Sequence, residues 1–376
     1  MKFLILDPYY PSFLATFYRT NKVKEGDNYQ ELQSRLMDSL FGTSDFYSKA
    51  LIQLGHSAKE IVINDKVSQG LWARQYINQI SYSAADKLID ATLGSFKFIK
   101  ERVMSRWEER ILFEQIKTEK PDILYCQNIG YLNSGFLKKI KPMVGRTIGQ
   151  IASPIPPFKN YRVYDLIVTS FPHFVQRFKN LGIKSAYLKL AFEPRILSRV
   201  KQPIRKYDVT FVGGISRNHK RGFELLNKLA DNIKIDVWGY GKESLDKNSN
   251  LYKCHHGAVW GRQMYQVLQQ SKITINRHID AAENYANNMR LYEATGCGAM
   301  LITDGKDNIN ELFNVGHEVE VYDEVNDLIK KIKYYQDHPK RVNKIAKAGQ
   351  RRTIKDHNYQ KRMTELVDII DKYCKI

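Results

Sequence analysis

The stretch YDVTFVGGISRNHKRGFELL, residues 207 to 226, decides the fold, because a strand pattern begins afresh there in the middle of the chain. An apolar run ends in two glycines and is followed at once by a helical pattern. The same alternation already runs from residue 1 to about 195, and a basic segment with proline, 199–208, suits a linker between the two series. The sequence therefore predicts two α/β domains.

Apolar runs typical of buried strands occur on both sides of this break, with amphipathic helical patterns between them. Such alternation predicts parallel sheets covered by helices, which is a Rossmann-like architecture. We place strands at 2–7, 59–64, 121–128, 146–153, 164–170, 207–214, 233–240, 271–276, 298–304 and 318–323. Residues 65–118 interrupt the rhythm and are interpreted as a helical insertion in the first domain.

The composition fits a chain of two folded domains. The 376 residues are 43% hydrophobic and 26% charged, and no apolar run approaches the roughly 18 residues that span a bilayer. The opening MKFLILDPYY is typical of a first strand, so we expect a cytoplasmic protein. Four scattered cysteines without metal-ligand spacing predict reduced thiols and no metal site.

The formal net charge of +19 indicates an anionic partner. The region 330–362 holds 12 Lys or Arg residues against two acids, a local charge of +10. This basic region is either a solvated helical face or a contact with anionic lipid headgroups or a charged glycan. The sequence lacks the signatures of the common nucleic-acid-binding domains, which disfavours nucleic acid as the partner.

Motifs that are missing narrow the possible activities. The sequence contains no G-x-G-x-x-G, no G-x-x-x-x-G-K-[ST] and no G-x-S-x-G. Dinucleotide-dependent oxidoreductases, P-loop nucleotide hydrolases and the usual serine hydrolases are therefore disfavoured.

The glycine pair Gly213 and Gly214 is followed by Arg217, Lys220 and Arg221, just before a predicted helix. Backbone N–H groups, a helix N-terminus and several cations together make a good diphosphate-binding site. A plain turn at the end of a strand is the alternative interpretation.

A second stretch, NNMRLYEATGCGAMLITD at 287–304, supplies two charges on an apolar helical pattern. Arg290 and Glu293 are three residues apart and share a helix face, with Asn287 or Asn288 near the N-terminus of that helix. The two charges either form an internal salt bridge or divide between a phosphate, bound by Arg290, and ribose hydroxyls, bound by Glu293.

These stretches carry a family resemblance. The pattern N-x-R-x-Y-E-A-x-x-x-G-A at 288–299, FVGG followed by H-K-R, and G-x-x-x-G-R-Q-M-Y at 257–265 resemble the C-terminal domain of GT-B glycosyltransferases. The group is the spore-maturation-protein-like branch of the "glycosyl transferases group 1" proteins. The resemblance covers roughly residues 120–370.

The resemblance implies two Rossmann-like domains whose parallel sheets face each other across a cleft, with a C-terminal helix crossing back. It implies an acceptor-binding domain at 1–198, a donor-binding domain at 207–355 and a C-terminal helix within 356–376. It also implies metal-independent transfer of a sugar, without a cofactor, from a nucleoside diphosphate or CMP sugar to a glycan or lipid-linked acceptor. Bacterial cell-surface polysaccharide or glycoconjugate synthesis, at the inner membrane face, is the expected setting.

Further donor contacts are implied at the nucleobase and next to the sugar: His256, Gly257, Ala258, Asn288 and Tyr285. In retaining members two glutamates eight positions apart bracket the donor, and the second matches Glu293. Tyr285 stands where the first would be, and Gln150 stands where a histidine often follows an N-terminal strand. The resemblance therefore implies neither retention nor inversion.

An inverting enzyme needs a general base in the N-terminal domain. Asp45 and Asp7 are the candidates, although Asp45 can equally be a helix N-cap. His173, which follows a predicted strand, is a further candidate for a cleft residue. Two other functions stay open, namely a GT-B-fold nucleotide-sugar epimerase and a non-catalytic polyanion-binding protein on the same scaffold.

Overall fold

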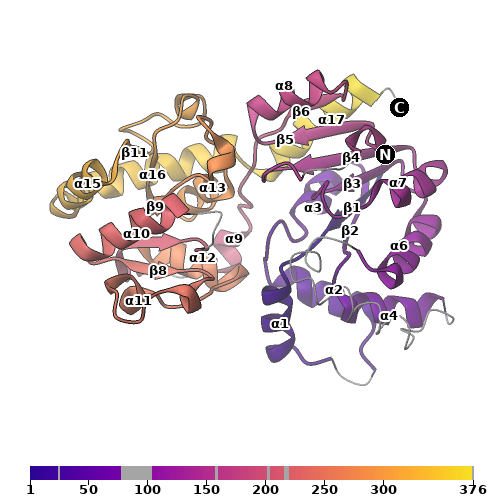
Figure 1. Cartoon of the computed structure of the whole chain (residues 1–376), viewed down its shortest axis with the longest axis horizontal. Coiled ribbons are helices and arrows are strands. Elements are labelled where there is room, and N and C mark those ends of the chain that lie inside the picture. The colour runs from indigo at the N-terminus through magenta and orange to yellow at the C-terminus, as the bar shows by residue number, and fades with distance from the viewer. Residues whose placement is uncertain (24–25, 78–103, 157–159, 201–203, 216–219, 375–376) are drawn as a thin grey trace. The chain divides into compact units, whose positions relative to one another are not determined.

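The computed structural model of the chain describes residues 1–23, 26–77, 104–156, 160–200, 204–215 and 220–374. They form two compact units, the first comprising Met1–Leu188 with Met363–Ile376 and the second Lys189–Arg362. Figure 1 labels most of the helices and strands of each unit. The predicted insertion and linker both include residues outside the described ranges.

The first unit is built on a six-stranded parallel sheet in the order β2-β1-β3-β4-β5-β6. All four residues of its central strand β3 are buried, as expected for a strand covered on both faces. Its strands are β1 (Lys2–Asp7), β2 (Ser57–Val62), β3 (Ile123–Cys126), β4 (Arg146–Ile151), β5 (Leu166–Thr169) and β6 (Ser185–Tyr187). Its helices are α1 (Pro11–Thr20), α2 (Tyr29–Asp38), α3 (Phe46–Gln53), α4 (Lys66–Tyr76), α6 (Arg106–Glu119), α7 (Ser134–Ile140) and α8 (Pro172–Asn180).

The second unit is built on a five-stranded parallel sheet in the order β11-β10-β9-β7-β8. Buried aliphatic side chains such as Val209, Ile275 and Leu328 form its core. Its strands are β7 (Tyr207–Val212), β8 (Asp236–Trp238), β9 (Ser271–Asn276), β10 (Met300–Asp304) and β11 (Glu320–Tyr322). Its helices are α9 (Ile196–Arg199), α10 (Lys220–Asn232), α11 (Asn250–Cys254), α12 (Gly261–Gln270), α13 (Met289–Gly296), α14 (Ile309–Leu312), α15 (Val325–Asp337) and α16 (Pro339–Asp356).

The last helix, α17 (Tyr359–Cys374), ends against the amino ends of two strands of the first sheet. Arg146 Nε donates to the carbonyl oxygen of Cys374 at 3.1 Å, and Lys184 Nζ donates to that of Tyr373 at 2.9 Å. Basic side chains at a helix C-terminus satisfy carbonyls that lack a partner within the helix. None of the described helices is long and apolar enough to cross a membrane.

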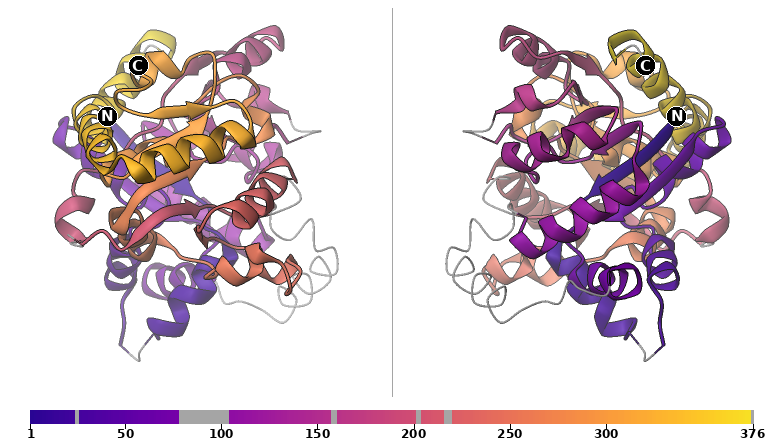
Figure 2. Two further views of the ribbon diagram at one scale, coloured as in Figure 1. Left: turned by 90° about the vertical axis from the view of Figure 1, so that its left-hand side faces the viewer. Right: turned by 90° about the vertical axis from the view of Figure 1, so that its right-hand side faces the viewer.

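Each sheet has a topological switch point, where successive connections leave in opposite directions. The switch point lies between β1 and β3 in the first unit and between β7 and β9 in the second. Figure 2 shows the two sheets and their covering helices from two further sides. In open parallel sheets ligands bind beyond the carboxyl ends of the strands at such points, so the functional site is sought there.

Candidate active site

In the second unit, the turns after β7 and β8 pack directly on each other. A Cβ atom on Gly239 would lie 1.8 Å from the carbonyl oxygen of Gly213, and Gly239 has a φ of +151° that favours glycine. A Cβ atom on Gly214 would lie 2.0 Å from the ring of Tyr240. Packing between the two turns therefore requires glycine at positions 214 and 239. The space next to the Gly214 Cα atom, where we expected a ligand to approach, is filled by the Tyr240 ring.

Gly214→Ala is expected to destabilise the protein by about 1–3 kcal/mol, because the added methyl group overlaps the Tyr240 ring. Thermal denaturation measures the loss. The double variant Gly214→Ala/Tyr240→Ala should recover most of it, since Tyr240 is 37% exposed and contributes little to the core. An unchanged melting temperature for Gly214→Ala would contradict this packing.

A helix N-terminus follows the glycine turn, as predicted. Helix α10 is 13 residues long and begins with Lys220 and Arg221. Arg217 lies outside the described residues, and so do the side chains of Lys220 and Arg221. The contribution of the three cations to phosphate binding thus stays a prediction.

Asn288 fixes the start of α13 to the carboxyl end of β9. Its side-chain oxygen accepts the backbone N–H of Leu291 at 3.2 Å, which makes it the N-cap. Its side-chain nitrogen donates to Oδ1 of Asn276, the last residue of β9, at 3.0 Å. The N-terminus of α13 is thereby held next to the switch point of the second sheet.

Arg290 and Glu293 share one face of α13 and pair with each other. Arg290 Nη1 lies 2.8 Å from Glu293 Oε2, and Tyr265 donates its hydroxyl to Glu293 Oε1 at 3.3 Å. Glu293 is buried, with 5% of its surface exposed. Arg290 Nε is also buried and has no hydrogen-bond partner among the described residues. The internal salt bridge between Arg290 and Glu293 is therefore present in this structure, and the Nε–H group of Arg290 donates no hydrogen bond among the described residues.

The loop between β9 and α13, which contains Tyr285, is held by a histidine–aspartate pair that the sequence analysis missed. His278 Nδ1 lies 2.7 Å from Asp304 Oδ1, and His278 Nε2 accepts the backbone N–H of Asn287 at 3.3 Å. Burial alone would raise the pKa of Asp304, but its hydrogen bonds with His278 and the nearby charge of Lys306 lower it to about 2. The sequence did contain a signal for this pair, because His278 follows β9 closely and Asp304 is the last residue of β10, the next strand along the chain.

The residues predicted for the nucleobase extend the second sheet beside β8. His256 donates its backbone N–H to Val237 at 2.8 Å, and Gly257 accepts that of Gly239 at 2.9 Å. The His256 ring stacks on Trp238 and its Nε2 lies 2.7 Å from Asp236 Oδ1. The His256 side chain thus has partners within the second unit. Gly257 and the exposed Ala258 follow it, next to the carboxyl end of β8.

Two aromatic rings flank this segment, and their parallel arrangement was not predicted from the sequence. Tyr240 follows β8 and Trp260 precedes α12, and their rings lie nearly parallel, with centroids 6.2 Å apart and an interplanar angle of 14°. Aromatic faces of this kind offer stacking surfaces for planar ligands such as nucleobases.

In the first unit, Asp7 ends β1 at the switch point. Its Oδ2 atom lies 3.5 Å from the hydroxyl of Thr43, which is 2.9 Å from Gln127 Oε1 beyond β3. Burial raises the pKa of Asp7 to about 7, and the contact with Thr43 opposes this rise only in part. A carboxyl group that titrates near neutrality suits a general base.

Asp45 occupies the N-cap position of α3, but its side chain makes no capping hydrogen bond and instead lies 3.3 Å from Lys49 Nζ. Glu60 takes over the capping role, because its carboxyl oxygens accept the backbone N–H and the hydroxyl of Ser48 at 3.0 and 2.9 Å. Burial raises the pKa of Glu60 well above its usual range.

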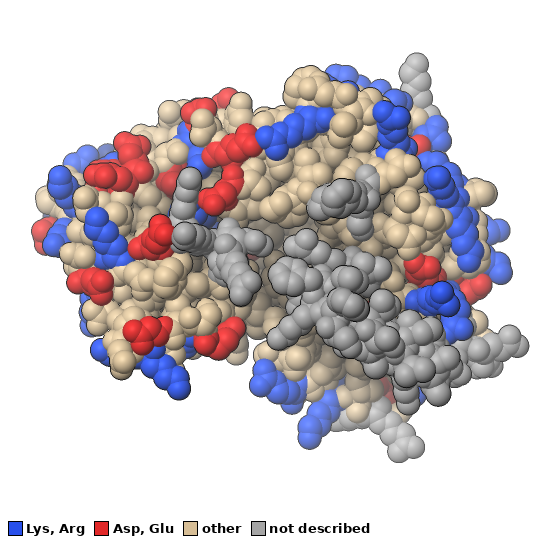
Figure 3. All heavy atoms as spheres, viewed as in Figure 1, with Lys and Arg blue, Asp and Glu red and all other residues tan. Residues whose placement is uncertain are grey.

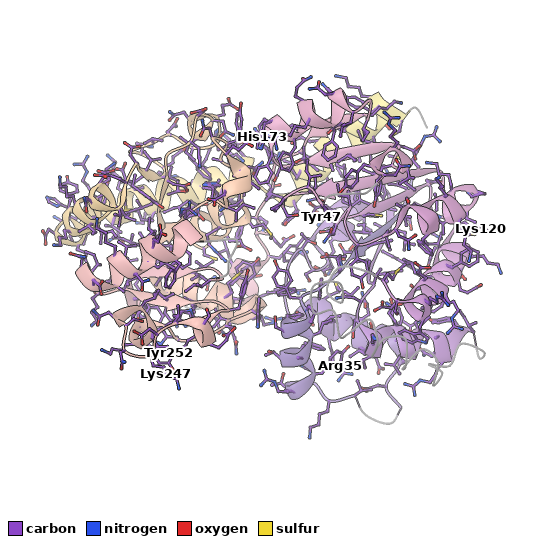
Figure 4. The ribbon with its side chains drawn as sticks, in the orientation of Figure 1. Arg35, Tyr47, Lys120, His173, Lys247 and Tyr252 are labelled. Atoms are coloured by element: carbon purple, nitrogen blue, oxygen red, sulfur yellow. The ribbon has the colours of Figure 1, made fainter. Side chains whose placement is uncertain are left out.

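Gln150 lies in β4 and is held by two tyrosines. Tyr125 and Tyr47 donate their hydroxyls to its Oε1 at 2.6 and 3.1 Å, and Figure 4 labels Tyr47. His173, also labelled there, lies in the first turn of α8 with its ring against Phe174, 4.7 Å between centroids. Gln150 thus belongs to a buried polar network.

Comparison with known proteins agrees with this architecture. Residues 219–368 match a protein family described as "Glycosyl transferase-like". No curated protein sequence matches the chain.

Solved structures resemble the whole chain at low sequence identity. HepE from Anabaena, in complex with UDP and glucose, is 12% identical, with a TM-score of 0.57 over 99% of this chain and 100% of its own. Sucrose-phosphate synthase from Thermosynechococcus elongatus is 10% identical, with a TM-score of 0.57 over 99% and 98%. A glycosyltransferase from Rickettsia africae is 12% identical, with a TM-score of 0.58 over 100% and 98%.

The chain therefore has the GT-B fold, with two parallel-sheet α/β units, as predicted. The segment that is similar to glycosyl transferases, residues 219–368, lies mostly in the second unit. The spore-maturation-protein-like branch within this fold stays a prediction.

Proposed function

We propose that the protein transfers a sugar from a nucleoside diphosphate sugar to a hydroxyl group of a glycan or lipid-linked acceptor, in bacterial cell-surface polysaccharide or glycoconjugate synthesis. The observation that carries the proposal is the start of α13, which Asn288 holds at the switch point of the second sheet with Arg290 in its first turn. A helix N-terminus and a guanidinium group together suit a diphosphate. UDP sugars are the first donors to test, since the HepE structure contains UDP; GDP and CMP sugars come next.

In this proposal the Arg290–Glu293 pair exchanges partners when the donor binds. Arg290 turns to the diphosphate, and its buried Nε gains the partner that it lacks. The released Glu293 carboxylate then accepts the ribose hydroxyls, which is the role proposed for it from the sequence. The nucleobase lies between Tyr240, Trp260 and the segment 256–258. Charge-assisted hydrogen bonds to the diphosphate compensate the loss of the internal pair.

Catalysis requires proton removal and leaving-group stabilisation. Asp7 takes the proton of the acceptor hydroxyl, whose oxygen forms a bond to the anomeric carbon. The bond from that carbon to the diphosphate oxygen breaks, and its electron pair stays on the diphosphate. Arg290, the cations around α10 and the two helix N-termini stabilise the charge there, an electrostatic role that needs no metal. Asp45 is the second candidate base, and its contact with Lys49 makes it the weaker one.

The direct test is incubation with a panel of UDP, GDP and CMP sugars, with and without a membrane glycolipid extract. Acceptor-dependent release of the nucleotide supports the proposal. Acceptor-independent isomerisation of the nucleotide sugar, seen by NMR, would instead identify an epimerase. No turnover of any nucleotide sugar, with binding only to polyanions, would leave the non-catalytic alternative.

We also propose peripheral attachment to the cytoplasmic face of the membrane through the basic region 330–362. Its support is the high positive charge of this region.

A further inference from the structure

A row of basic side chains runs along one face of α16. Its members, which we call the α16 basic row, are Lys340, Lys344, Lys347, Arg351 and Lys355. Spacings of three and four residues place them on one side of the helix, and all five are exposed. Side chains such as Val342 and Ile345 on the other side are buried. From its first to its last member the row is about 22 Å long.

The row carries its charge without internal compensation. Within the described part of the chain, its first four members form no ion pair, whereas the neighbouring Arg352 pairs with Asp356. On the face drawn in Figure 3, by contrast, acidic and basic side chains of the second unit are interleaved.

The α16 basic row destabilises the helix that carries it. The first turn of α16 contains Lys340 and Arg341 and no acid, although the positive end of the helix dipole favours acids there. Like charges four residues apart, such as Lys340 and Lys344, repel each other. Helix stability therefore does not explain the row, whereas an anionic partner would offset both effects.

We propose that the α16 basic row is the part of region 330–362 that docks the protein onto an anionic lipid surface, an inference that rests on the membrane attachment proposed above. A straight, convex helix presents its charges along one line, which suits a plane of headgroups rather than the grooves that follow a nucleic-acid strand. Tyr334, 39% exposed at the α15–α16 junction, lies with its ring centroid 5.6 Å from the Arg341 guanidinium, and tyrosine favours the membrane interface. The row has no apolar member, so the attachment is electrostatic and independent of the proposed sugar transfer.

The test is co-sedimentation of the full chain with two kinds of vesicle, one of phosphatidylcholine alone and one in which about a third of the lipid is phosphatidylglycerol. Each is used at low and at high salt. The test variant is Lys344→Gln/Lys347→Gln/Arg351→Gln. The matched control, Lys228→Gln/Lys234→Gln/Lys247→Gln, removes the same charge from exposed positions of the same unit. Figure 4 shows Lys247 at the lower edge of this unit, far from α16 in Figure 1.

The wild type is expected to bind only the anionic vesicles and to be released by high salt. Each basic residue at such a surface contributes roughly fivefold, so the row variant should bind about 100-fold more weakly. The control should bind within about threefold of the wild type, since its charges lie away from the surface.

Three results would overturn the proposal. The wild type could fail to bind anionic vesicles at low salt. The row variant and the control could lose binding equally, which would indicate a response to net charge alone. The row variant could keep vesicle binding and lose binding to polyuridylate RNA, which would identify the row as a nucleic-acid surface.

Discussion

Asp7→Asn is expected to lower turnover by about 10²–10⁴-fold, the usual contribution of a general base. Nucleoside diphosphate affinity should stay within about twofold, because Asp7 belongs to the first unit, whereas the residues proposed to bind the donor belong to the second. The wild-type rate should rise with pH through an apparent pKa of about 7, because burial raises the pKa of the Asp7 carboxyl group to about this value. Steady-state kinetics across pH 5 to 9 measure all three effects.

The same variant should be more stable than the wild type in alkaline solution. The folded-state pKa of Asp7 is about 7, above its ordinary value of 3.8, so ionisation opposes folding as pH rises between these values. Asparagine avoids this cost, and we expect a gain of about 1–3 kcal/mol at pH 8 that disappears below about pH 4. Denaturant unfolding at the two pH values tests the sign.

Asp45→Asn is the matched control, since it also neutralises a carboxylate at the same sheet edge. It should retain near-wild-type turnover, because Asp45 is engaged with Lys49. Full turnover of Asp7→Asn together with a collapse of Asp45→Asn would move the base to Asp45.

The second large effect concerns the buried pair in α13. Arg290→Met or Glu293→Gln alone should destabilise the protein by about 3 kcal/mol, because each leaves a buried group without its ion partner. The double variant should be much closer to the wild type, since it removes both charges. Its nucleoside diphosphate affinity should nevertheless fall by about 10–100-fold, because the charge-assisted contacts to the ligand are lost.

The exposed pair Lys272–Asp208, 2.6 Å apart, is the matched control. Its double neutralisation should change stability by less than about 1 kcal/mol and leave nucleotide affinity unchanged. Wild-type nucleotide affinity in the Arg290→Met/Glu293→Gln variant would show that neither residue contacts the donor.

Most of the fold could be predicted because strands and helices repeat with local periods. Strand β9, for example, has the predicted bounds 271–276, and every predicted strand overlaps one in the structure. Strand β6 was missed because three residues, Ser185–Tyr187, are too few to show a pattern. The shared helix face of Arg290 and Glu293 was also accessible from their spacing.

The packing of the site could not be predicted, because it joins residues that are distant in sequence. Nothing near Gly214 reveals that the ring of Tyr240 covers it. His278 and Asp304 meet only because β9 and β10 are neighbours in the sheet. Local spacing suggested Asp45 as an N-cap, whereas the capping carboxylate, Glu60, comes from β2.

The central claim is that the second unit binds a nucleoside diphosphate at the start of α13. Thermal denaturation of the wild type with UDP, GDP, CDP and ADP, next to the Arg290→Met/Glu293→Gln variant, tests it most directly. We predict that at least one of these nucleotides raises the wild-type melting temperature by several degrees, as saturating ligand does, and that the variant does not respond. A wild-type melting temperature that none of the four changes would contradict the claim.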